Sequence, residues 1–195
     1  MTLSENLRKL HKNPLYRFAF NFVLFSFITI TFHYLWWNFL GFFRATDLYL
    51  TISGALAENV FRVSSWINLN LLGLNMYTED ATNTLRFPGI GYITVVEACS
   101  GFKQFYQIFF LFVLFPGPWQ HKLWYIPLCI AIMYVVNFMR IVILSLVLIH
   151  ATPHWDFAHM WILRPFFYVV IFIQWIVWVE YFLNQNKKQP IQLTA

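Results

Sequence analysis

The fold is decided by residues 123–149, LWYIPLCIAIMYVVNFMRIVILSLVLI. This run holds one charged side chain, Arg140, in otherwise apolar sequence. A helix crosses the hydrocarbon core of a bilayer with about 20 apolar residues. The run is therefore long enough to span a membrane with tilt, or with a bend near Pro127 or Asn137.

The composition extends this conclusion to the whole chain. Hydrophobic residues make up 59% of the 195 residues and charged residues only 11%. A soluble domain carries roughly 25% charged residues, because its surface faces water. We therefore predict an all-α polytopic membrane protein. The net charge of +5 indicates topology first, and nucleic-acid binding is not expected, because no basic run is interleaved with exposed aromatic residues.

Three other segments are apolar enough to form membrane helices. Two of them reach spanning length, whereas the third is shorter and stops at a Pro-Gly-Pro sequence. Together with the run quoted above, they predict four spans. The three segments are residues 16–40, residues 102–115 with Pro116-Gly117-Pro118 after them, and residues 162–183.

The sequence between the first two of these segments is more polar. We expect residues 48–74 to form an amphipathic helix, at the interface or packed inside the bundle, because they carry several charged and polar side chains. Residues 75–97 have the weakest helical pattern. Within them, Pro88-Gly89 is a turn signal between two short β-prone runs. These runs predict a small β-hairpin over residues 85–96, and the whole chain then has about four to six transmembrane or interfacial helices.

The placement of Lys and Arg predicts the orientation. The basic tails, residues 1–15 and 185–195, are expected in the cytoplasm, and Lys122 marks a third cytoplasmic segment. The hairpin and the polar loop before the last span then lie on the extracytoplasmic side. Residues 1–195 thus form one integral membrane domain, with the helical bundle at residues 16–184.

Cys99 lies where the irregular segment meets the next helix, in the sequence Glu97-Ala98-Cys99-Ser100-Gly101. Ser100 is a candidate N-cap. The free N–H groups of the first helical turn and Lys103 favour the thiolate form of the side chain, whereas Glu97 acts the other way. A buried structural cysteine is the competing interpretation. The position at a helix start, and Gly101, which allows close backbone approach, bring the reactive interpretation level with it.

Asn137 and Arg140 are three residues apart and share one face of the long apolar helix. An arginine inside a membrane helix is costly unless it faces a partner or a wet cavity, so it indicates a functional site. Its planar guanidinium suits an oxyanion or a substrate carbonyl. The alternative is a structural ion pair with Glu97, Asp156 or Glu58.

The polar loop at residues 150–159 contributes histidines and an aspartate. A histidine beside Asp156 could supply a general base and its orienting carboxylate. A metal site formed by His154, His159 and Cys99 is a second interpretation, and a solvated loop without a role is a third. Taken together, a cysteine nucleophile, a histidine base and an arginine that stabilises the tetrahedral intermediate indicate cysteine acyl transfer, with no metal and no cofactor.

These residues resemble the exosortase/archaeosortase family of integral membrane proteins. The resemblance covers residues 48–183 and rests on Glu97-Ala98-Cys99-Ser100-Gly101, on Asn137-Phe138-Met139-Arg140-Ile141 and on the His/Asp loop before the final helix. It implies a multi-pass sorting transpeptidase at the extracytoplasmic face of the inner (cytoplasmic) membrane. Its implied substrates are exported proteins that end in a short motif, a hydrophobic helix and a basic tail. The upstream part is held as a thioester and passed to an acceptor.

The same resemblance implies the roles of individual residues. Cys99 is the nucleophile and Arg140 the second catalytic residue. The family's third position is a histidine, or in archaeal members an arginine, near the start of the last helices. We prefer His159, because it directly precedes the final span, with His154 as the alternative and Arg164 also competing. The expected supporting residues are Glu97, Ser100, Gly101, Asn137, Asp156 and Arg164.

A second hypothesis is that the chain is not an enzyme. It would then be a non-catalytic membrane subunit or carrier, in which Arg140 and the histidine loop bind an anionic lipid, a sugar-phosphate or a quinone. The expected partners are otherwise the exported substrates and membrane lipids. The sequence predicts neither the oligomeric state nor the substrate motif.

Overall fold

The computed structural model describes residues 14–183, and the structural statements below concern these residues. The predicted tails, residues 1–15 and 185–195, lie outside them except at positions 14 and 15. The chain is an all-α polytopic membrane protein with one small β-sheet.

Three helices are long and apolar enough to cross a membrane. They cover the first, third and last of the predicted spans. The last one shows that the predicted polar loop at residues 150–159 was wrong, because the chain is helical again from Thr152, with Pro153 in the first turn, where it costs no hydrogen bond. The three helices are α2 (Pro14–Asn38), α6 (Trp119–His150) and the series η4 (Thr152–His154), α7 (Trp155–Phe157), η5 (Ala158–Leu163), α8 (Arg164–Val177) and η6 (Trp178–Leu183).

Helix α5 (Phe102–Leu114) is shorter than a membrane span. Its 13 residues give it a length of about 20 Å, against a hydrocarbon core of about 30 Å. The structure thus confirms the shorter apolar helix predicted for residues 102–115, although only three other helices among the described residues reach spanning length. The turn η3 (Glu97–Cys99) and two further residues precede it, so Cys99 lies just ahead of the helix.

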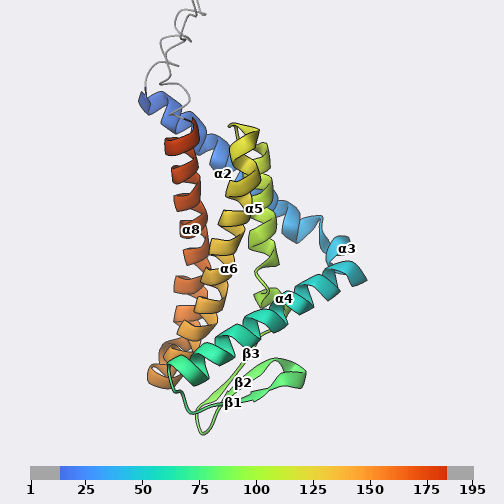
Figure 1. Ribbon diagram of the computed structural model, residues 1–195, viewed down its shortest axis with the longest axis vertical. Helices are drawn as coiled ribbons and strands as arrows, with labels where there is room; N and C mark the ends of the chain where they lie inside the picture. The colour runs from blue at the N-terminus through green and yellow to red at the C-terminus, as the bar shows by residue number, and fades with distance from the viewer. Residues whose placement is uncertain (1–13, 184–195) are drawn as a thin grey trace, which may run out of the picture.

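The long helices form a bundle whose two ends differ (Figure 1). Helices α5, α6 and α8 run side by side, and α2 crosses them obliquely. Helix α4 (Asp47–Trp66) lies across one end of the bundle, with α3 (Gly41–Arg44) at its corner and η1 (Ile67–Leu71) at its far end. Both termini of the described chain lie at the opposite end. The bundle core is aromatic and includes Phe25, Phe112, Phe115, Trp175 and Trp178.

Helix α4 is the amphipathic helix predicted for residues 48–74. One of its faces is buried against the sheet and α6, through Ala57, Val60 and Phe61. Its other side carries exposed apolar residues such as Leu48 and Trp66. The helix thus closes the end of the bundle and presents an apolar surface of the kind found at a membrane interface.

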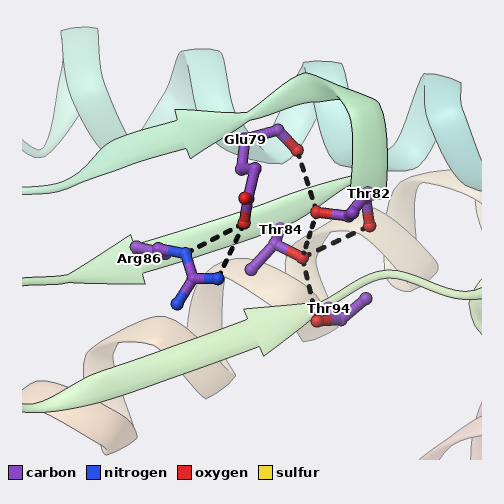
Figure 2. A network of polar contacts seen from close by, with 5 residues as sticks. All are labelled: Glu79, Thr82, Thr84, Arg86 and Thr94. Atoms are coloured by element: carbon purple, nitrogen blue, oxygen red, sulfur yellow. Dashed lines mark hydrogen bonds and ion pairs between the residues drawn. The ribbon is translucent and has the colours of Figure 1, made fainter.

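The sheet has one strand more than the predicted hairpin. Its order is β1-β2-β3, with antiparallel neighbours β1 (Tyr77–Glu79), β2 (Thr84–Phe87) and β3 (Gly91–Thr94). The first strand was missed because it has only three residues and no apolar alternation. One face of the sheet carries polar side chains (Figure 2). On it, Arg86 Nε donates to Glu79 at 2.9 Å, and the Thr84 and Thr94 hydroxyls are 2.9 Å apart. Leu85, Phe87, Ile93 and Val95 form the buried inner face.

Lys122 has a structural role that its charge alone did not predict. Its side chain is buried, and Nζ donates to the carbonyl oxygens of Val113 at 3.0 Å and Phe115 at 2.7 Å. The ammonium also lies 4.4 Å from the centre of the Trp119 ring. The last carbonyls of a helix have no partner within it, so Lys122 serves as the C-terminal cap of α5 and not as a free loop charge.

We expect Lys122→Met to destabilise the bundle, because it leaves buried carbonyl oxygens of α5 without a donor. The expected loss is about 2 kcal/mol, the range for hydrogen bonds to a charged group. Thermal unfolding in detergent, followed by tryptophan fluorescence, measures it. Gln120→Met, at an exposed position in the same helical turn, is the control and should leave the midpoint unchanged. Equal midpoints for both variants would contradict this role of Lys122.

Candidate active site

The candidate site is built around a short turn that carries Cys99. The backbone N–H of Cys99 donates to the carbonyl oxygen of Val96 at 2.7 Å, which closes the η3 turn. The side chain of Cys99 is half-buried. Cys129, the other cysteine, is fully buried in the aromatic core, as expected for a small hydrophobic residue.

Gly101 lets this turn approach helix α6 closely. Its φ of 82° lies in the left-handed region. A Cβ atom there would lie 3.1 Å from Asn137 Nδ2 and 3.2 Å from Phe105 Cζ. In return, Asn137 Nδ2 donates to the carbonyl oxygen of Cys99 at 2.7 Å, from a side chain that is 1% exposed. Two predicted supporting residues thus hold the backbone of the cysteine against α6.

The prediction that Ser100 is the N-cap of α5 was wrong by one residue. Gly101 occupies the cap position, because only its positive φ turns the chain into the helix at this point. Ser100 is buried, and its Oγ accepts a hydrogen bond from the backbone N–H of Phe102 at 3.2 Å. It therefore still satisfies one free donor of the first helical turn.

Arg140 connects the cysteine to the last membrane helix. Its Nη2 lies 3.0 Å from His159 Nε2, and its guanidinium lies over the Phe167 ring, 5.6 Å from the ring centre. The same guanidinium is close enough to Cys99 for the two side chains to act on each other electrostatically. Cys99 from η3, Arg140 from α6 and His159 from η5 are thus brought together, although they are far apart along the chain.

Arg140 does not form the structural ion pair considered as its alternative role. Glu58 pairs instead with Arg62, one turn further along α4, at 2.6 Å. Neither Glu97 nor Asp156 forms an ion pair with Arg140 within residues 14–183. Both carboxylates are exposed. The half-buried side chain of Arg140 therefore has an imidazole and an aromatic ring beside its guanidinium, and no carboxylate partner among the described residues.

The contact with Arg140 determines the tautomer of His159. A guanidinium only donates hydrogen bonds, so Nε2 accepts and the neutral ring carries its proton on Nδ1. The ring also packs on Trp155, with 5.0 Å between ring centres. Asp156 acts on His159 through its charge but forms no hydrogen bond with it in the described chain. The predicted orienting carboxylate is thus absent from the described residues around His159, and the ring is positioned by the donor Arg140 and by Trp155.

Two of the candidates for the third residue lie elsewhere. His154 is exposed, and within residues 14–183 its side chain contacts neither Cys99 nor Arg140. Arg164 is exposed and acts on Arg140 and His159 through its charge. His159 itself forms no hydrogen bond with Cys99 in this part of the chain, and its Nε2 contacts Arg140 instead.

Further cations surround the start of α5. Lys103 Nζ lies 3.3 Å from His33 Nδ1, and it feels the charges of Arg164 and Arg44. His33 Nδ1 is also 2.8 Å from the Tyr168 hydroxyl, so α2, α5 and α8 meet here. The sequence reasoning missed these contacts. The available signal was a histidine inside the apolar run of the first span, since polar residues in membrane helices commonly face a partner.

These cations give the site a positive potential. Within the described residues, the carboxylate ion pairs are Arg62 with Glu58 on α4 and Arg86 with Glu79 in the sheet, and neither involves a cation named above. None of the cations near Cys99 has such a partner there. The same residues contain no group of three His, Cys, Asp or Glu side chains that could hold a metal ion. Chemically, the arrangement suits a thiolate and an oxyanion.

Comparison with models of known protein families gives a match. A family model described as transmembrane exosortase matches residues 16–179, and this range includes every candidate site residue. No curated protein and no solved structure matches the chain.

We expect Gly101→Ala to disturb the cysteine turn, because a side chain there has an unfavourable φ and pushes on Asn137. The expected cost is about 1–2 kcal/mol for the backbone conformation alone. Thermal unfolding and the alkylation rate of Cys99 measure the effect.

Gly54→Ala is the matched control for that substitution. Gly54 lies inside α4, and no atom lies within 4 Å of the place that a Cβ atom would take, so alanine there should stabilise the helix by roughly 0.5–1 kcal/mol. The role assigned to Gly101 fails if both variants change stability and alkylation in the same direction.

Proposed function

This chain belongs to the transmembrane exosortase family, and from that membership we propose that it is a membrane-embedded cysteine transpeptidase. It cleaves the C-terminal sorting signal of exported proteins and transfers them to an acceptor. The observation that supports this most directly is the meeting of Cys99, Arg140 and His159 from three separate elements. If Cys99 had only a structural role, that role would not explain why Arg140 lies near it without a carboxylate partner in the described chain.

The proposed reaction has two acyl-transfer steps. The sulfur of Cys99 bonds to the scissile carbonyl carbon, the C–N bond breaks, and the thiol's proton ends on the leaving amine. The acceptor's nucleophilic atom then bonds to the thioester carbonyl, and the Cys99 thiolate leaves. Arg140 stabilises the negative charge on sulfur and on the tetrahedral oxygen. His159 carries protons to the leaving amine and from the acceptor, with Nε2 becoming available when Arg140 turns to the oxyanion.

We place the site near the extracytoplasmic boundary of the inner membrane, with both termini in the cytoplasm. Asn137, which binds the cysteine turn, lies 18 residues into the 32-residue helix α6, or about 27 Å from its start. A hydrocarbon core of about 30 Å then puts the turn close to the far boundary. The rest of α6 extends beyond it to support the sheet and α4, at the end of the bundle away from the termini (Figure 1).

A second function, a non-catalytic carrier or subunit that binds an anionic lipid, sugar-phosphate or quinone, is favoured by one observation. Arg140, Arg164, Lys103 and Arg44 act on one another through their charges, and within residues 14–183 none has a carboxylate ion pair. Such a cluster attracts anions whether or not it runs a reaction. This hypothesis predicts ligand binding that needs Arg140 and is indifferent to Cys99.

We expect Cys99→Ala to abolish cleavage of a secreted reporter that carries a tail of short motif, hydrophobic helix and basic end. Cys129→Ala, which removes the buried thiol, should retain cleavage. Arg140→Lys keeps the positive charge but loses the planar guanidinium with its paired N–H donors, and should slow cleavage by about 100-fold. Immunoblotting of the reporter measures all three, with membrane insertion of each variant as a control. Cleavage by Cys99→Ala would remove the cysteine from the mechanism and favour the carrier.

The two histidines form a matched pair for testing the third residue. His159→Gln should lower the cleavage rate by at least about 100-fold, the usual contribution of a general acid–base group. His154→Gln should behave like the wild type, because His154 is exposed and away from Arg140. The assignment is wrong if His154→Gln is the variant that loses activity.

A further inference from the structure

The strand that leads to Cys99 is an edge strand of the sheet. In the order β1-β2-β3, β3 pairs with β2 on one side, and within the described residues no strand pairs with its other side (Figure 2). The exposed side chains Tyr92 and Val96, with 63% and 45% of their surfaces accessible, lie along this segment. An edge strand presents backbone N–H and C=O groups to any extended chain that comes alongside.

The pairing with β2 shows which backbone groups are free. The N–H of Val95 donates to the carbonyl oxygen of Asn83 at 2.9 Å, so Val95 faces β2. Backbone direction alternates along a strand, and Ile93 therefore faces β2 as well. The N–H groups of Tyr92, Thr94 and Val96 point the other way, to the free edge. None of these three N–H groups has another backbone partner within residues 14–183.

This free edge continues directly into the candidate active site. Val96, the last residue with an outward N–H, is also the residue whose carbonyl oxygen closes the turn of Cys99. The register of the edge is held by side chains, since the Thr94 and Thr84 hydroxyls are 2.9 Å apart and Arg86 lies over the Tyr92 ring. A peptide paired with this edge would therefore reach the thiol in a defined register.

The direction of the segment matches that of the substrate assumed in the proposed function. Residues 91–114 run from strand β3 through the cysteine turn into the apolar helix α5. A sorting signal runs in the same order, from its motif into its hydrophobic helix. When two such helices lie side by side in a membrane with the same polarity, their preceding segments also run parallel.

We propose that the extended segment before the substrate's hydrophobic helix binds as a fourth strand, parallel to β3, through the backbone groups of Tyr92, Thr94 and Val96. This inference rests on the proposed function. Main-chain pairing supplies affinity for almost any sequence, and alternate side chains of the bound strand face the sheet's two sides and supply selectivity. The strand ends beside the turn of Cys99, which puts a peptide bond within reach of the sulfur.

Proline substitution tests this pairing. Proline removes one N–H and is tolerated in an edge strand where that N–H faces away from the sheet. Tyr92→Pro and Thr94→Pro should each lower the cleavage of the tailed reporter by about 5–10-fold, the value of a hydrogen bond of about 1 kcal/mol. Tyr92→Ala and Thr94→Val lose the same side-chain contacts and keep the N–H, so each proline variant should cleave about 5–10-fold more slowly than its matched control. The alkylation rate of Cys99 should be unchanged in all four variants.

A crosslinking experiment keeps the proposal testable if a proline variant does not fold. In the Cys99→Ala background, Thr94→Cys should form disulfides with alternate positions of single-cysteine reporters, just upstream of the hydrophobic helix. Tyr77→Cys, on the opposite edge of the sheet, should form none.

The outcomes separate this inference from the proposed function. Proline variants that cleave like the wild type, or crosslinks at Tyr77 and not at Thr94, would overturn the strand pairing and leave the transpeptidase intact. A wild-type protein that cleaves no tailed reporter would overturn the transpeptidase itself.

Discussion

The arrangement of the site depends on an arginine inside a membrane helix. Arg140 cannot lose its proton, so placing it in apolar surroundings is costly unless other groups replace water. The structure supplies the imidazole of His159, the face of Phe167 and an electrostatic interaction with Cys99, while the Nε of Arg140 has no hydrogen-bond partner among residues 14–183. Because these groups come from the last span and from the cysteine turn, satisfying the charge also fixes the position of both elements against α6.

The thiol has its place in the turn directly before the 13-residue helix α5. This turn packs against α6, where its backbone groups need hydrogen-bond partners. Asn137 provides one by donating to the Cys99 carbonyl, and Gly101 leaves room for it to do so. At the other end of α5, Lys122 likewise donates to a backbone carbonyl oxygen, that of Phe115.

Patterns along the chain predicted the helices and the residues of the site, but not their partners. The long apolar runs, Gly101 and Asn137 carry signals in their own residue types. The hydrogen-bond partner of Arg140 could not be predicted, because contacts between helices depend on how each helix is rotated about its axis and how deep it lies in the bundle. The choice between His154 and His159 illustrates this. Five residues in an α-helix correspond to a rotation of about 140°, so only one of the two can face Arg140, and the irregular turns of η4 and η5 decide which one.

One continuous segment, residues 91–114, contributes the free edge, the thiol and the short helix. A substrate that engages all three has to match the distances between them as well as their surfaces. Backbone pairing and helix packing both tolerate many side chains. Under the strand-pairing proposal, the spacing between a substrate's extended motif and the start of its hydrophobic helix therefore selects which peptide bond meets Cys99. Selection by spacing suits an enzyme whose proposed substrates differ widely upstream of a common tail.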